Sequence, residues 1–133
     1  MNIFYLHNDT KLCAEQHVDK HVVKMIVEYA QLLSTAHRMI DGEEYIGKSK
    51  TGRKVKRYRM TNPNLDKTVY LAVHYHHPSA VWARETKLQY EWLYSLFVEL
   101  GKEYSYRYGN KIHSTNALLN DVLSNAPENI KLE

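Results

Sequence analysis

Residues 10–40 carry polar side chains at alternating steps of four and three, which is the spacing of one face of an α-helix. At about 100° per residue, these positions occupy one narrow sector of the helix, roughly a quarter to a third of its circumference. Apolar side chains flank the sector on both sides, so most of the helix surface is suited to burial. We call these positions the polar stripe: His17, His21, Lys24, Glu28, Gln31, Thr35 and Arg38.

The narrow polar stripe has two interpretations. A helix that faces solvent normally carries a broader polar face, so the stripe either lines a cleft or is the exposed side of a well-covered helix. Titratable groups that line a cleft commonly form a functional site. In both cases the segment predicts a long first helix that begins at Asp9 or Thr10, ends at about Ile40 and is stopped by Asp41-Gly42.

Three shorter helical segments follow, and together they predict an all-α fold. A second helix is expected over residues 62–77, because an Asn-Pro pair opens it and a proline follows it. A third is expected from about Ser79, with Gly101 weakening the prediction that it is unbroken, and a short fourth from Ser114. At 133 residues, the chain is predicted to be a single domain, residues 1–133, of about four helices around the long first helix.

Residues 43–61 form a polar connection, either a loop or a β-hairpin, that concentrates positive charge. Within it, twelve positions hold seven of the chain's 18 Lys and Arg residues, while all 15 Asp and Glu residues lie outside those positions. Such a cluster is either a solvated surface or a contact for a polyanion, and it favours DNA or another nucleic acid as the partner. The seven cations are Lys48, Lys50, Arg53, Lys54, Lys56, Arg57 and Arg59.

Histidine and aromatic residues gather around Pro78, where one predicted helix gives way to the next. Ser79 and the free backbone amides there are suited to holding an anion, and Arg84 lies one turn later. The alternative is a purely structural corner between two helices. Together with two positions of the polar stripe, this cluster supplies the candidate substrate-binding residues: Gln31, Arg38, His76, His77, Ser79, Trp82 and Arg84.

The candidate catalytic residues lie in the first half of the polar stripe. Lys24 and Glu28 are four residues apart, which fits either a helix-stabilising ion pair or an amine nucleophile beside a general acid/base. His17 and His21 have the same spacing, by which a helix presents two imidazoles to one metal ion. We expect no cofactor, but the alternative is a divalent metal held by a set of four histidines: His17, His21, His74 and His77.

The cysteine content and the hydrophobic segments of the sequence indicate the compartment in which the protein is found. The single Cys13 excludes an internal disulfide and a cysteine zinc cluster, and a reducing compartment is the simplest setting. The first residues lack the basic lead and the apolar run of a signal peptide, and no segment approaches the ~20 apolar residues of a membrane span. The sequence therefore predicts a cytoplasmic protein without a membrane partner, whose oligomeric state stays open.

Two segments resemble an uncharacterised family of small proteins of tailed bacteriophages. One is the first 42 residues, with Cys-Ala-Glu-Gln-His-Val-Asp-Lys-His-Val-Val-Lys-Met at residues 13–25 and Ala-Gln-Leu-Leu-Ser-Thr-Ala-His-Arg at residues 30–38. The other is His-His-Pro-Ser-Ala-Val-Trp-Ala-Arg at residues 76–84, together with Glu-Tyr at 103–104 and Arg-Tyr-Gly at 107–109. The resemblance covers most of the chain. It implies a phage origin without implying a chemistry.

In its size, long first helix and basic connection, the chain is also distantly similar to the small all-helical pyrimidine-dimer DNA glycosylases of phages. In that family the N-terminal α-amine attacks the sugar C1′ and a glutamate of the first helix assists, which implies these roles for Met1 and Glu28. This chain differs at two points. Asn2 is expected to leave Met1 in place, and Lys24 with Glu28 is only analogous to the arginine-glutamate pair of that family.

These features together predict an enzyme that acts on nucleic acid, a DNA glycosylase with AP lyase activity. An amine, from Met1 or Lys24, would attack C1′ of a damaged nucleotide while Glu28 serves as general acid/base. His17 and His21 would orient Glu28 or contact phosphate. Two alternatives stay open: a metal-dependent hydrolase of a nucleotide or phosphodiester, and a non-enzymatic accessory protein that binds nucleic acid.

Overall fold

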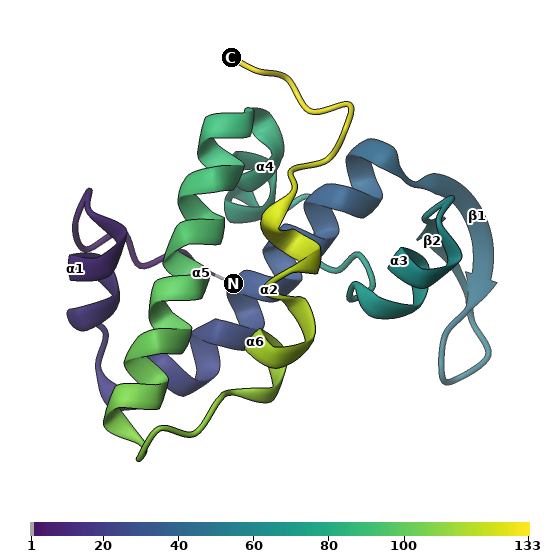
Figure 1. Ribbon diagram of the computed structural model, residues 1–133. Coiled ribbons are helices and arrows are strands. Elements are labelled where there is room, and N and C mark those ends of the chain that lie inside the picture. The colour runs from purple at the N-terminus through teal and green to yellow at the C-terminus, as the bar shows by residue number, and fades with distance from the viewer. Residues whose placement is uncertain (1) are drawn as a thin grey trace.

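Helix α2 (Asp19–Asp41) lies at the centre of the protein, of which a computed structural model describes residues 2–133 (Figure 1). It packs against α5 (Lys87–Arg107) and α4 (Pro78–Glu85), and buried apolar side chains from all three helices form one core. Leu32 and Leu33 of α2 are fully buried, and each such side chain contributes about 2 kcal/mol by leaving water. The predicted central helix is therefore present, although its bounds differ.

The predicted first helix is in fact two helices, α1 (Thr10–Glu15) and α2. Asp9 caps α1 as expected, because its side chain accepts a hydrogen bond from the Leu12 amide. The helix breaks after Glu15 because Arg107 of α5 binds the carbonyl oxygens of Glu15 and His17 at 2.9 and 2.7 Å. A distant cation thus satisfies carbonyl groups that a continuous helix would have used internally.

The all-α prediction is wrong, because residues 43–61 contain a two-stranded antiparallel sheet and the fold is mixed α/β. Strand β1 (Glu43–Lys48) pairs with β2 (Lys54–Arg59), with Glu43 opposite Arg59 and Lys48 opposite Lys54. A turn whose Gly52 has φ +83° joins the strands. Figure 1 shows this hairpin at the edge of the molecule, beyond the end of α2.

The second predicted helix is also shorter than expected. Helix α3 (Pro63–Thr68) begins at the predicted Asn62 cap, but residues 69–73 are not helical. The reason is Arg38, whose guanidinium binds the carbonyl oxygens of Asp66, Val69 and Tyr70 at 2.7–2.8 Å. These carbonyls would otherwise accept from amides four residues later in a continuing helix.

The predicted third helix divides at Thr86, whose side chain caps α5 by accepting from the Gln89 amide. Helix α5 then runs unbroken through Gly101. A glycine is needed at this position because the side chain of Asn116 occupies the space that a Cβ would take. Asn116 belongs to α6 (Ser114–Leu119), which is followed by a short 3-10 turn (Val122–Ser124). The glycine is therefore a close-packing position between α5 and α6.

Residues 2–8 contain no helix or strand and form an N-terminal arm. Ile3 and Phe4 pack against the core, so the arm is held to the body. Within residues 2–133, every helix is too short or too polar to cross a lipid bilayer.

Arg38 connects α2 to the base of the hairpin and to α3. Besides the carbonyls of Asp66, Val69 and Tyr70, its guanidinium binds the Tyr58 carbonyl at 2.7 Å and the Asp66 carboxylate at 2.8 Å. All five N–H donors of the guanidinium are used in this way. Hydrogen bonds from the Met60 amide and from Arg38 lower the pKa of Asp66.

We predict that Arg38→Met lowers the free energy of unfolding by about 3–5 kcal/mol, because it leaves a carboxylate and four carbonyls without their donor. Urea denaturation measures the change. The matched control is Lys102→Met, since Lys102 pairs with Glu99 on the surface and its side chain is 68% exposed, against 3% for Arg38. The control should change the free energy of unfolding by less than about 1 kcal/mol. Equal effects of the two substitutions would contradict this role of Arg38.

Candidate functional site

The hairpin sorts its cations onto two faces. Residues directly opposite in an antiparallel pair point to the same side, and side chains alternate along each strand. Lys48 therefore shares a face with Lys54, and Ile46 shares it with Lys56. We call this surface the lysine face: Ile46, Lys48, Lys54 and Lys56, all of which are exposed.

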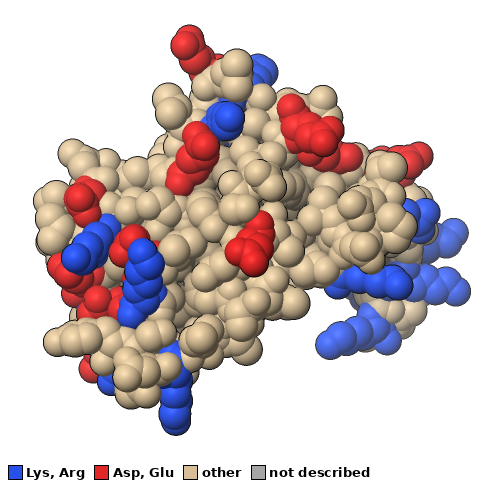
Figure 2. Space-filling view, viewed as in Figure 1, with Lys and Arg blue, Asp and Glu red and all other residues tan. Residues whose placement is uncertain are grey.

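The opposite face of the hairpin holds the arginines. The guanidinium of Arg59 lies 4.2 Å from the ring centre of Tyr45, and Arg57 lies across Gly47. Lys50 and Arg53 belong to the turn that joins the strands. The seven predicted cations are thus gathered on one hairpin, as Figure 2 shows at the right of the molecule, but only three of them point from the lysine face.

Aromatic side chains continue the lysine face onto the body of the protein. Tyr58, at the base of β2, lies on the same side as Lys56 and Lys54. Its ring contacts Tyr75 edge to face at 5.7 Å, and Tyr75 contacts His76 at 4.6 Å. These three rings form an aromatic row: Tyr58, Tyr75 and His76.

Arg84 of α4 lies within electrostatic reach of Tyr58 in this aromatic row. Burial lowers the pKa of its guanidinium, which nevertheless stays charged at neutral pH. Its Nη1 atom is buried and makes no hydrogen bond within residues 2–133. The side chain as a whole is half-buried, so part of the cation remains accessible to an anionic group of a ligand.

An open hollow of about 550 Å³ lies at the start of α4, and Pro78, two residues after His76, is the first residue of α4 that lines it. Trp82 forms one wall, and its ring meets Trp92 edge to face at 6.1 Å. Tyr5 of the arm stacks on the other side of this aromatic pair, 4.7 Å from Trp92. We call this hollow the α4 pocket: Ile3, Tyr5, Pro78, Ser79 and Trp82. Its apolar and aromatic lining is suited to a flat, weakly polar group such as a nucleobase.

The polar stripe passes from solvent into the core along α2. Lys24 is 72% exposed and its Nζ lies 3.9 Å from Oε2 of Glu28, whose side chain is 18% exposed. Gln31 is half-buried, while Thr35 is fully buried and accepts a hydrogen bond from the Val73 amide. The stripe is thus partly covered, so neither interpretation of it holds along its whole length.

Arg38, at the end of the polar stripe, has a structural role. All five of its donors are bound within the protein, so none is available to a phosphate. His77 uses one of its two ring nitrogens for the fold, because its Nδ1 accepts from the Ser79 amide and caps α4. His21 is half-buried and its ring stacks on Phe4 of the arm at 4.6 Å. The structure therefore does not bring these three side chains to the α4 pocket as free ligands.

His17 belongs to a closed hydrogen-bond network that holds the arm. Its Nδ1 lies 2.8 Å from the Cys13 carbonyl, so this nitrogen carries the proton and Nε2 accepts from the Tyr29 hydroxyl at 2.9 Å. The Tyr29 oxygen in turn accepts from the Phe4 amide, and the Cys13 thiol donates to the Phe4 carbonyl. Burial is the main cause that lowers the pKa of His17. The neutral imidazole is the form that this network needs.

The network assigns roles to two residues that the sequence reasoning did not include in the site. Tyr29 and Cys13 fix the arm at Phe4, and the neighbouring Ile3 and Tyr5 line the α4 pocket. The i,i+4 spacing of Cys13 and His17 was visible in the sequence, but the pairing with the arm was not. Met1, the other candidate amine, lies outside the described residues.

The four histidines of the alternative metal site are not arranged as one set of ligands. Both ring nitrogens of His17 are hydrogen-bonded, and His77 caps a helix. His74 is exposed at φ +45°. Over the part of the chain that the structure describes, no three His, Cys, Asp or Glu side chains form a group that would hold a metal ion.

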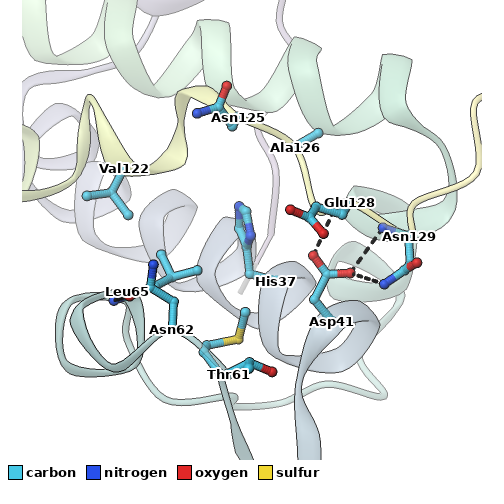
Figure 3. A pocket seen from close by; sticks show the side chains of 11 residues that line it. His37, Asp41, Thr61, Asn62, Leu65, Val122, Asn125, Ala126, Glu128 and Asn129 are labelled. Carbon is cyan, nitrogen blue, oxygen red and sulfur yellow. Dashed lines mark hydrogen bonds between the residues drawn. The ribbon is translucent and has the colours of Figure 1, made fainter.

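A second cavity, of about 390 Å³, lies at the C-terminal end of α2, between α3 and the C-terminal segment of the chain (Figure 3). Asp41 on its edge accepts from the amides of Glu128 and Asn129 at 2.7 and 3.0 Å. His37, buried at its floor, binds the Tyr90 hydroxyl at 2.8 Å, and burial lowers the pKa of His37. These polar groups hold the C-terminal segment in place, and no predicted site residue lines this cavity.

No family model matches the chain, and no match was found among curated proteins or among solved structures.

We predict that the protein loses stability as the pH falls below about 6.5. The folded state lowers the pKa of His17, His37 and His113, so the unfolded state binds more protons below their usual value of 6.5. His17→Gln removes one of these titrations while keeping a hydrogen-bonding side chain. The free energy of unfolding should therefore fall less steeply for this variant between about pH 7.5 and pH 5.5. Parallel curves for variant and wild type would show that His17 is not linked to folding.

Proposed function

We propose that this chain binds DNA and acts on it as a glycosylase with AP lyase activity, in the cytoplasm of a phage-infected cell. The observation that carries the proposal is the run of ring contacts from Tyr58 on the side of the lysine face to His76, which lies two residues before the α4 pocket begins at Pro78. Cations attract the phosphate backbone, while aromatic rings stack on bases. A hollow beside such a surface is suited to a base that has left the stack.

Arg84 supports a phosphate contact next to the aromatic row. It lies within electrostatic reach of Tyr58, and its side chain as a whole is only half-buried. Its positive charge would attract a phosphate to the part of the guanidinium that stays exposed. Ser79, at the start of α4, faces the α4 pocket and would supply a hydroxyl there.

The catalytic step is assigned to an amine and to Glu28. The amine lone pair would form a bond to C1′ as the glycosidic bond breaks, and the leaving base would take the electron pair and a proton from Glu28. Glu28 would then take a proton from the bound amine and pass it to the ring oxygen O4′ as the amine lone pair breaks the C1′–O4′ bond. The products are a protonated Schiff base at C1′ and a free hydroxyl group at C4′. Lys24 lies beside Glu28, and the arm lies close to this part of α2 because Phe4 binds Tyr29.

We predict that DNA binding depends on the lysine face and not on the arginine face. Log affinity falls as log salt concentration rises, and each phosphate contact contributes about 0.9 to the steepness of this fall. The double variant Lys54→Gln/Lys56→Gln should therefore make the fall shallower by about 2. The matched control is Arg57→Gln/Arg59→Gln, which removes two charges from the same strand on the opposite face. Fluorescence anisotropy with a labelled duplex at several salt concentrations gives both slopes.

The control variant should keep a slope close to that of the wild type. Thermal unfolding of both variants checks that the hairpin still forms, since Arg59 also contacts Tyr45. Equal losses from the two faces would show that DNA contacts the hairpin without the orientation that we propose.

We predict that borohydride traps a covalent adduct between the wild-type chain and a duplex with an abasic site. Glu28→Gln should lower the rate of strand cleavage by about 100-fold, the usual contribution of a general acid/base. Lys24→Arg keeps the charge but removes the nucleophilic amine. Its control is Lys102→Arg, another exposed lysine beside a glutamate on a helix. Electrophoresis of the reduced products measures both the adduct and the cleavage.

Loss of the adduct with Lys24→Arg alone would identify Lys24 as the nucleophile. An adduct that survives this substitution would be assigned to the N-terminal amine, and peptide mapping would confirm that position. Salt-sensitive binding without any adduct would instead favour the accessory protein. About one bound divalent metal per chain, with metal-dependent phosphodiester hydrolysis, would favour the hydrolase.

A further inference from the structure

Ile46 lies among the cations of the lysine face. Its side chain is 62% exposed, and no other aliphatic side chain within residues 43–59 is as exposed. Lys56 stands directly opposite it across the sheet, and Lys48 lies two positions along the same strand on the same face. A β-branched side chain therefore projects between at least two lysines.

The placement of Ile46 differs from that of the other aliphatic residue of the hairpin. Val55 lies on the arginine face and is half-buried beside Gly47, its cross-strand partner. Lys48 and Lys54 lie on the lysine face next to the turn. The one carboxylate on this side of the hairpin is Glu44, which lies at the base and accepts a hydrogen bond from the Tyr58 hydroxyl. The apolar group thus occupies the middle of a surface whose outer half is entirely cationic.

We infer that Ile46 is a wedge that inserts between adjacent base pairs of duplex DNA from the minor groove. The inference rests on the proposed DNA binding. It adds that the DNA is a duplex and that the protein unstacks one of its base steps. In this arrangement, the hairpin lies along the groove with the lysine face toward the bases. The lysines on either side reach the two phosphate backbones, and Ile46 occupies the space between base steps.

Wedges of this type unstack one base step and kink the duplex, at a cost of a few kcal/mol that additional contacts offset. A wedge in the minor groove kinks the duplex toward its major groove and opens the minor groove, next to which the aromatic row follows the lysine face. A base next to an unstacked step leaves the helix more easily, which would assist its entry into the α4 pocket.

The experiment uses the full chain with a short duplex that carries a fluorophore pair at its ends and 2-aminopurine at its centre. Wild-type protein should increase the 2-aminopurine fluorescence and shorten the end-to-end distance. Ile46→Ala should abolish both changes, while its affinity should fall by less than about threefold because the lysines are retained. Ile46→Val should preserve both changes, and Val55→Ala, on the opposite face, is the matched control.

The outcomes separate this inference from the proposed function. Salt-dependent binding by wild-type protein without unstacking or bending would overturn the wedge and leave DNA binding intact. The wedge would also be overturned if the Ile46→Ala variant still produced both the fluorescence increase and the shortening. Absence of any DNA binding would overturn the proposed function and the wedge together.

Discussion

The buried guanidinium of Arg38 is the interaction on which the rest of the structure depends. Because it binds carbonyls of β2 and of residues 66–70, it fixes the hairpin and the chain after α3 to the same end of α2. The charge is tolerated in the core because the Asp66 carboxylate accepts one of its donors. Arg38 thereby helps to hold the lysine face and the aromatic row in position, together with the contact between the rings of Tyr58 and Tyr75.

A second network holds the other side of the candidate site. His17, Tyr29 and Cys13 bind the backbone of the arm at Phe4, and the arm supplies one wall of the α4 pocket. The pocket is therefore assembled from segments that are distant in the chain, the arm and the start of α4. Its shape depends on a neutral imidazole, whereas the hairpin depends on a charged guanidinium.

Local signals in the sequence were sufficient for the caps at Asp9 and Asn62 and for the cationic segment, but not for the caps at His77 and Thr86. Asp9 and Asn62 begin helices as expected, and α2 ends at Asp41. The breaks could not be predicted in this way, because Arg107 and Arg38 end helical segments by binding carbonyls of residues that are far from them in sequence. The hairpin was one of two open alternatives, and its imperfect alternation concealed two faces that differ in charge type.

The central claim is that one surface, from the lysine face to the α4 pocket, contacts DNA. Titration of the isotope-labelled chain with a short duplex, followed by two-dimensional nuclear magnetic resonance, tests it most directly. The account predicts that the amide signals of Ile46, Lys56 and Tyr75 and the indole signal of Trp82 shift together with one affinity. It also predicts that signals around His37 in the second cavity stay unchanged. Shifts confined to that cavity, or scattered without a continuous surface, would contradict the account.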